Sequence, residues 1–127
     1  AASMIDEYPI LSVAASCAQG RTYMPGIAEL RVKETDRIAV MASGLKDCGV
    51  SVDEQPDSLT VDGQKQITGG ATIASQHDHR IAMSFLVLGM VSQQTVSVID
   101  TETIATSFPQ FASLMNSAGA KIYAPEV

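Results

Sequence analysis

Tryptophan is absent from this sequence, aromatic residues make up only 5% of it, and cations are scarce. The 127 residues include 8 Lys and Arg against 14 Asp and Glu, which gives a formal net charge of −6. This balance argues against general nucleic-acid binding, which needs an overall or strongly patterned positive field. Because 46% of the residues are hydrophobic, we expect a globular protein with a core of Ala, Val, Ile, Leu and Met.

Cysteines and long apolar runs are also few. Cys17 and Cys48 lie in apolar helical patterns, which predicts buried free thiols in a reducing compartment. The longest apolar run, residues 81–91, is too short to cross a bilayer, and the first residues have no signal-peptide character. We therefore expect a cytoplasmic protein. Because Met4 is not terminal, we also expect this chain to be a segment of a longer one.

The order of predicted elements indicates an α/β fold with helices packed against sheets. Helices are expected over residues 8–18, 35–48, 79–91 and 108–117. Strands are expected near residues 21–24, 50–53, 59–61, 95–99 and 121–123, with mostly loop over 62–77. Gly49 is the predicted stop of the second helix, on which Ile38, Met41, Leu45 and Cys48 share one face.

A repeat is visible in this order. Residues 6–61 and 78–124 each follow the sequence helix, strand, helix, glycine, strand, and residues 62–77 link them. We interpret the chain as one partial domain, 1–127, built from two copies of one α/β unit. Two copies with so long a period do not fit a small solenoid array.

The window Arg31 to Arg37 concentrates charge just before the second helix. Five of its seven residues are charged, and it holds three of the eight cations in the chain. Lys33 and Arg37 are spaced as an i,i+4 pair, which fits either an anion site or a solvated helix face. Glu34 is on the same side as the apolar residues of the helix. It therefore fits a partly buried structural carboxylate or a proton carrier.

The notable polar residues all occur where predicted helices begin. They are Asp6; Lys33, Glu34 and Arg37; His79 and Arg80; and Thr106 with Ser107. Helix N-termini favour anions, so parallel helices would direct these groups to one pole. Asp6 and Asp78 equally fit the role of helix caps. The pattern His77-x-His79 has no third ligand at convincing spacing, so we expect no metal, and there is no Gly-rich phosphate loop.

Four segments, in order, resemble the 5-enolpyruvylshikimate-3-phosphate synthase family (3-phosphoshikimate 1-carboxyvinyltransferase). They are Asp6-Glu7-Tyr8-Pro9, Leu30-Arg31-Val32-Lys33-Glu34-Thr35-Asp36-Arg37, Asp78-His79-Arg80-Ile81-Ala82-Met83 and Thr106-Ser107-Phe108-Pro109. The resemblance covers essentially the whole chain but only the C-terminal third or less of a full-length member. It implies two βαβαββ-type units of one lobe of an enolpyruvyl transferase.

The resemblance also implies a reaction and residue roles. The enolpyruvyl group of phosphoenolpyruvate passes to the 5-hydroxyl of shikimate 3-phosphate, and phosphate leaves, by addition and then elimination. By this resemblance, Asp6 binds shikimate hydroxyls and accepts a proton, and Glu34 is the other acid/base group. Lys33 binds the shikimate 3-phosphate. Arg37 and Arg80 clamp phosphoenolpyruvate, with His79 beside them.

The resemblance leaves alternatives open. Many members have Lys at the position of Thr106. With Thr there, this chain resembles the class II, often glyphosate-tolerant subgroup. A UDP-N-acetylglucosamine enolpyruvyl transferase shares the fold, although the Lys33 to Arg37 match disfavours it. A structural module without activity of its own is the third possibility, since the missing N-terminal part would complete the site. For the full-length enzyme we expect a monomer with no cofactor and no nucleic-acid or membrane partner.

Overall fold

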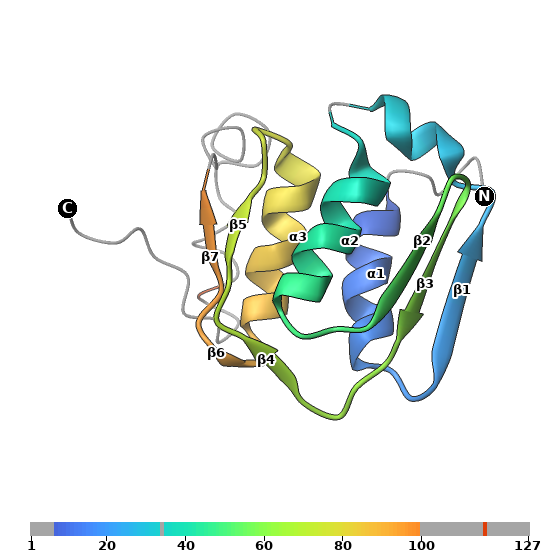
Figure 1. Ribbon diagram of the computed structural model, residues 1–127. Coiled ribbons are helices and arrows are strands. Elements are labelled where there is room, and N and C mark those ends of the chain that lie inside the picture. The colour runs from blue at the N-terminus through green and yellow to red at the C-terminus, as the bar shows by residue number, and fades with distance from the viewer. Residues whose placement is uncertain (1–6, 34, 100–115, 117–127) are drawn as a thin grey trace.

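The computed structural model describes residues 7–33, 35–99 and 116. The elements are α1 Tyr8–Cys17, β1 Arg21–Pro25, the 3-10 helix η2 Ala28–Val32, α2 Arg37–Asp47, β2 Val52–Gln55, β3 Ser58–Asp62, β4 Ile67–Gly69, β5 Thr72–Ala74, α3 His79–Gly89, β6 Ser92–Gln94 and β7 Ser97–Ile99. The three α-helices lie together between a three-stranded sheet and the short strands β4 to β7 (Figure 1). The predicted α/β architecture, with helices packed against sheets, is confirmed.

The three-stranded sheet is antiparallel, in the order β1-β3-β2. Alternate side chains point to opposite faces of a strand, and the buried residues Met24, Leu59 and Val61 face the helices. Between them, Tyr23 and Thr60 are on the outer face, where Tyr23 is exposed. This one-sided burial holds the sheet against α1 and α2.

Residues 62–77 contain two strands, so the prediction of mostly loop there was wrong. β4 pairs in parallel with β6, and β5 pairs in parallel with β7. Helix α3 connects the two halves of each pair, as a crossover between parallel strands requires. Strands of three residues are too short to show an alternating pattern. Their pairing depends on partners more than 20 positions away, with Ile67 opposite Ser92.

Helix α2 buries the face that the periodicity predicts. Ile38, Met41, Leu45 and Cys48 are all at most 2% exposed. The helix ends at a Schellman motif, in which the Val50 N–H donates to the Leu45 carbonyl at 2.9 Å and the Gly49 N–H donates to the Lys46 carbonyl at 3.0 Å. Gly49 has φ of 91°, a left-handed conformation that glycine adopts without steric cost.

The packing of α2 on α3 depends on a glycine. A methyl group on Gly44 of α2 would lie 2.8 Å and 2.9 Å from ring carbons of Phe85, which is itself fully buried on α3. The absence of a side chain at Gly44 therefore sets how closely the two helices approach. Their first turns carry several of the predicted site residues, so this contact contributes to the geometry at that end.

Several sequence expectations need correction. Helix α2 begins at Arg37 and not near Thr35, and β6 was not predicted. Both cysteines are free, but only Cys48 is buried, because Cys17 is on the exposed side of the last turn of α1. Of the predicted helix over 108–117 the structure describes only Asn116, which is helical, and the predicted strand over 121–123 lies outside the described residues. The two-copy repeat therefore stays a prediction.

Candidate functional site

The three α-helices run in the same direction, so their first turns lie at one end of the molecule (Figure 1). Helix η2 and the turn between β2 and β3 are at this same end. Unpaired backbone N–H groups and the positive end of the helix dipole make such an end favourable for anions. The common pole expected from the sequence is thus present for the three described helices.

A buried ion pair joins the first turns of α2 and α3. The Arg37 guanidinium donates from Nε to Asp78 Oδ2 at 2.8 Å and from Nη2 to Asp78 Oδ1 at 3.1 Å. The side chains are 1% and 0% exposed, respectively. This two-pronged contact gives Arg37 a counter-ion inside the protein. The alternative of a solvated helix face is therefore wrong for Arg37.

Asp78 also caps α3. Its carboxylate accepts hydrogen bonds from the backbone N–H of Arg80 at 3.1 Å and of Ile81 at 3.4 Å, as the cap prediction required. The Thr35 hydroxyl donates to Asp78 Oδ2 at 2.8 Å. Burial by itself raises the pKa of Asp78. The hydrogen bonds from Arg37 and Thr35, with the charge of Arg37, outweigh this effect, and the pKa lies below its ordinary value.

Lys33 does not share a helix with Arg37. It follows η2 in an extended conformation, and its Nζ lies 3.6 Å from Glu29 Oε1. The interpretation of Lys33 and Arg37 as an i,i+4 pair was therefore wrong, because η2 ends at Val32 and α2 begins only at Arg37. The Lys33 side chain is 24% exposed, so it lies partly open to solvent near the same pole.

His79 and Arg80 are the first two residues of α3, and both are partly exposed. The chain reaches them through Gln76 and His77, which have φ of 54° and 62°. Two consecutive left-handed residues other than glycine are uncommon and cost conformational energy, as is seen at functional sites. This turn brings the chain from β5 to the position where Asp78 points inward and α3 begins.

The remaining predicted site residues, Asp6 and Glu34, lie outside the described residues, as do Thr106 and Ser107. The expected cap at Asp6 therefore stays a prediction; the residue before α1, Glu7, makes no side-chain capping hydrogen bond. The structure therefore brings together Arg37, His79 and Arg80 around Asp78. The motif Asp78-His79-Arg80 had indicated Asp78 only as a cap, and its pairing with Arg37 was missed.

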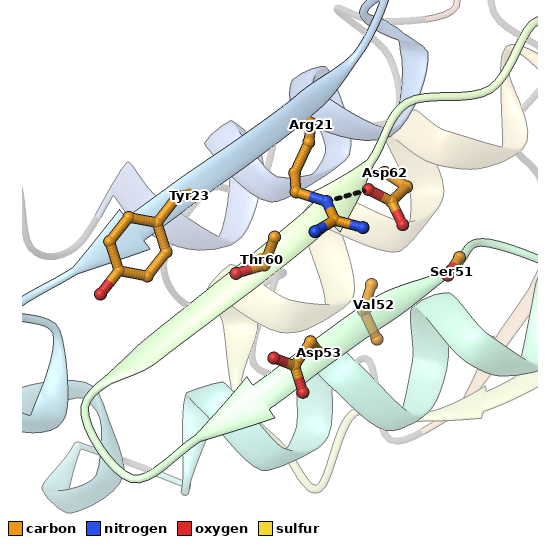
Figure 2. A pocket seen from close by; sticks show the side chains of 7 residues that line it. All are labelled: Arg21, Tyr23, Ser51, Val52, Asp53, Thr60 and Asp62. Carbon is orange, nitrogen blue, oxygen red and sulfur yellow. Dashed lines mark hydrogen bonds and ion pairs between the residues drawn. The ribbon is translucent and has the colours of Figure 1, made fainter.

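A shallow hollow of about 480 Å³ lies elsewhere, on the outer face of the three-stranded sheet (Figure 2). Its lining residues are Arg21, Tyr23, Ser51, Val52, Asp53, Thr60 and Asp62. Arg21 Nε donates to Asp62 Oδ1 at 2.8 Å across the two strands. None of the predicted site residues lines this hollow. The ion pair within it is exposed, and contacts of that kind are common on sheet surfaces.

Within the described part of the chain, no three His, Cys, Asp or Glu residues are close enough to hold a metal ion. Among those same residues, no helix combines the length and apolar character needed to cross a membrane. What the described pole offers is therefore helix N-termini, one buried arginine–carboxylate pair and partly exposed cationic side chains. The class that these observations define is an α/β module whose helix N-termini meet at one pole, a position that favours anions.

Comparison with known proteins narrows this class. Residues 1–115 match the family described as EPSP synthase (3-phosphoshikimate 1-carboxyvinyltransferase), and this chain belongs to that family. It is 60% identical over 123 residues to the 3-phosphoshikimate 1-carboxyvinyltransferase of Paramagnetospirillum magneticum, and 58% identical over 124 residues to that of Cereibacter sphaeroides. These matches cover 96% and 98% of this chain.

The fold agrees with a solved member. A structure of EPSP synthase from Acinetobacter baumannii superposes with a TM-score of 0.91 at 45% identity, covering 97% of this chain and 29% of that one. The chain spans about 28% of the length of the curated relatives it matches. The family resemblance and the α/β fold of an EPSP synthase are thus confirmed.

Proposed function

We propose that this chain is part of an enzyme that transfers the enolpyruvyl group of phosphoenolpyruvate to the 5-hydroxyl of shikimate 3-phosphate and releases phosphate. Relatives from two organisms with 58–60% identity carry the name of this transferase. The proposed enzyme is cytoplasmic and monomeric, and it needs no cofactor. The chain supplies the C-terminal portion of such an enzyme.

The buried pair of Arg37 and Asp78 is the observation that supports this proposal most directly. Asp78 accepts from two nitrogens of Arg37 and also caps α3, so the guanidinium is fixed beside the first turn of the helix that carries His79 and Arg80. Two substrates that are both anions repel each other. A site that unites them needs fixed cations and helix N-termini that are in place before the substrates bind.

Each residue has a proposed role. Arg80, which is partly exposed, binds phosphoenolpyruvate directly, with His79 beside it. Arg37, held by Asp78, is the second member of the proposed clamp. Lys33 binds shikimate 3-phosphate. Asp6 and Glu34 are proposed as the two proton-handling carboxylates, since addition to the double bond protonates carbon while a hydroxyl loses its proton. Two carboxylates in different environments suit these two tasks.

We expect the 127 residues alone to have no turnover, because the rest of the enzyme would supply much of the shikimate 3-phosphate site. We also expect the chain alone to bind phosphoenolpyruvate weakly. A titration followed by NMR would detect shifts of the backbone signals of His79 and Arg80 at millimolar ligand. Measurable steady-state turnover by the chain alone would contradict the proposed division of the site.

The reaction itself is tested in a chimera. This segment replaces the corresponding 123 residues of the Paramagnetospirillum magneticum relative, and phosphate release is measured with phosphoenolpyruvate and shikimate 3-phosphate together. We expect turnover that requires both substrates. A chimera that unfolds cooperatively, like the intact relative, yet releases no phosphate would refute the proposal.

A pair of variants separates the proposed site from the rest of the surface. Arg80→Gln removes one proposed phosphoenolpyruvate ligand, and we expect KM for phosphoenolpyruvate to rise by roughly 10- to 100-fold, as for loss of a charged contact of about 1.5–3 kcal/mol. Arg21→Gln is the matched control, because Arg21 is an exposed arginine on the outer sheet face that pairs with Asp62. Equal KM values in the two variants would exclude Arg80 as a ligand.

A further inference from the structure

Arg31 makes hydrogen bonds with every nitrogen of its guanidinium. Its Nη1 donates to Asp36 Oδ2 at 2.9 Å and to Glu54 Oε2 at 3.0 Å. Its Nε donates to the Pro56 carbonyl at 2.9 Å, and its Nη2 donates to the Gln55 carbonyl at 2.8 Å. All three nitrogens of the guanidinium thus bind acceptors of this chain. The contact with Asp36, together with that of Glu54, raises the pKa of Arg31 and keeps it charged.

These bonds connect three separate elements. Arg31 belongs to η2, Asp36 is the N-cap of α2, and residues 54–56 form the end of β2 and the turn that follows it. A second contact holds η2 to the same turn, since the Ala28 N–H donates to Asp57 Oδ1 at 2.6 Å. Arg31 therefore attaches both η2 and the start of α2 to the β2–β3 hairpin.

The loop between Arg31 and Asp36 is closed by this contact. One side chain joins the end of η2 to the N-cap of α2, which limits the conformations open to Lys33 and Thr35. Asp36 in turn accepts from the Ala39 N–H at 3.0 Å and so determines where α2 begins. The next residue, Arg37, enters the buried pair with Asp78. The contacts of Arg31 thus lead, through Asp36, to the start of the helix that carries Arg37.

We infer that Arg31 is a positioning residue that closes the 31–36 loop through Asp36 and Glu54 and thereby presents Lys33 and Arg37 to the anionic substrates. The inference rests on the function proposed above. It assigns to Arg31 a role that needs no contact with substrate. Lys33 and Arg37 are the proposed ligands, Arg37 while held by Asp78, whereas the printed contacts of Arg31 are to Asp36 and the hairpin. Misplacement by about 1 Å of groups that bind substrate can cost roughly 100-fold in rate.

The kinetic test uses Arg31→Met and Arg31→Lys in the full-length chimera. Lys keeps the charge but is a single point donor and cannot reproduce the forked contacts of Arg. If Arg31 positions the loop, both variants raise KM for both substrates by roughly 10- to 100-fold. If Arg31 acted only by its charge, Arg31→Lys would keep the original KM, and that result would overturn the inference.

Glu54→Gln provides an independent perturbation, because Glu54 contacts the guanidinium from the hairpin and is not among the proposed substrate ligands. We expect it to raise the same KM values, and its effect to disappear once Arg31 is already Met. Arg21→Gln, at the exposed pair on the sheet, is the matched control and leaves KM unchanged. A lowered Tm with unchanged KM in the Arg31 and Glu54 variants would show a purely structural role and would also overturn the inference.

A measurement without substrate keeps this inference separate from the proposed reaction. Hydrogen exchange at the amides of Ala39 and Val40, which donate to the Asp36 carboxylate and carbonyl, is compared in wild type, Arg31→Met and Arg21→Gln, all in the chimera. We expect exchange at these amides to become at least tenfold faster only in Arg31→Met. If the wild-type chimera releases no phosphate, the proposed function fails while this comparison still decides on Arg31. Unchanged exchange in Arg31→Met would refute the positioning role.

Discussion

Arg37 and Asp78 are 41 positions apart in the chain, and their side chains form a buried two-pronged contact of 2.8 Å and 3.1 Å. The contact joins the first residue of α2 to the cap of α3. Taking both charges out of water is costly, so such a pair is weak evidence for stability by itself. Removal of one partner, however, leaves the other charge buried and uncompensated.

Asp78→Asn should therefore destabilise the fold strongly. The amide can still cap α3, but it cannot balance the charge of Arg37, and we expect a loss of about 3–5 kcal/mol in the free energy of unfolding. Urea denaturation followed by circular dichroism measures this loss. Asp62→Asn, at the exposed pair with Arg21, is the control and should change the midpoint little. Equal midpoints for Asp78→Asn and wild type would contradict the role assigned to the pair.

The lowered pKa of Asp78 should make the stability of the fold depend on pH. The pKa of Asp78 is lower in the folded state than its ordinary value, about 3.9 in an unfolded chain. The folded state therefore gains stability from Asp78 above about pH 4 and loses it as the pH falls through the lowered pKa. Urea midpoints measured from pH 7 down to pH 2 should fall more steeply for wild type than for Asp78→Asn. The same slope in both proteins would refute this assignment.

Gly44→Ala should destabilise the fold although alanine is the better helix former. The added methyl group would press on the ring of Phe85, which is buried and cannot move away freely. Overpacking of this kind costs about 1–3 kcal/mol. Ser43→Ala, at the neighbouring exposed position of α2, is the control and should keep or slightly raise the stability. If Gly44→Ala is as stable as Ser43→Ala, the close approach of α2 and α3 is not required.

The two cysteines should differ in reactivity. Cys17 is exposed, whereas Cys48 is buried, and burial raises the pKa of the Cys48 thiol. Because the thiolate is the reactive form, an aromatic disulfide reagent should modify Cys17 rapidly and Cys48 only after unfolding. Cys17→Ser should remove the fast phase, and Cys48→Ala should leave it intact. A fast reaction at Cys48 in the folded protein would contradict its burial.

Much of the fold follows from local patterns in the sequence. The buried face of α2, its stop at Gly49 and the cap of α3 at Asp78 were predicted, because helix periodicity and capping depend on residues within a few positions of each other. The short strands in residues 62–77 and the placement of Lys33 were not. Three-residue strands carry almost no periodic signal, and the break between η2 and α2 separates Lys33 from the helix that its spacing suggested.

The sequence alone thus determined the family, the α/β class and the segment from Arg31 to Arg37 as the centre of interest. Only the tertiary structure showed which partners each cation of this segment binds. Arg31 and Arg37 are alike in the sequence, yet one is bound by Asp36 and the hairpin, and the other by Asp78. Partners 23 and 41 positions away reach these side chains only when the helices and the hairpin pack together. For this reason local sequence patterns could not assign them.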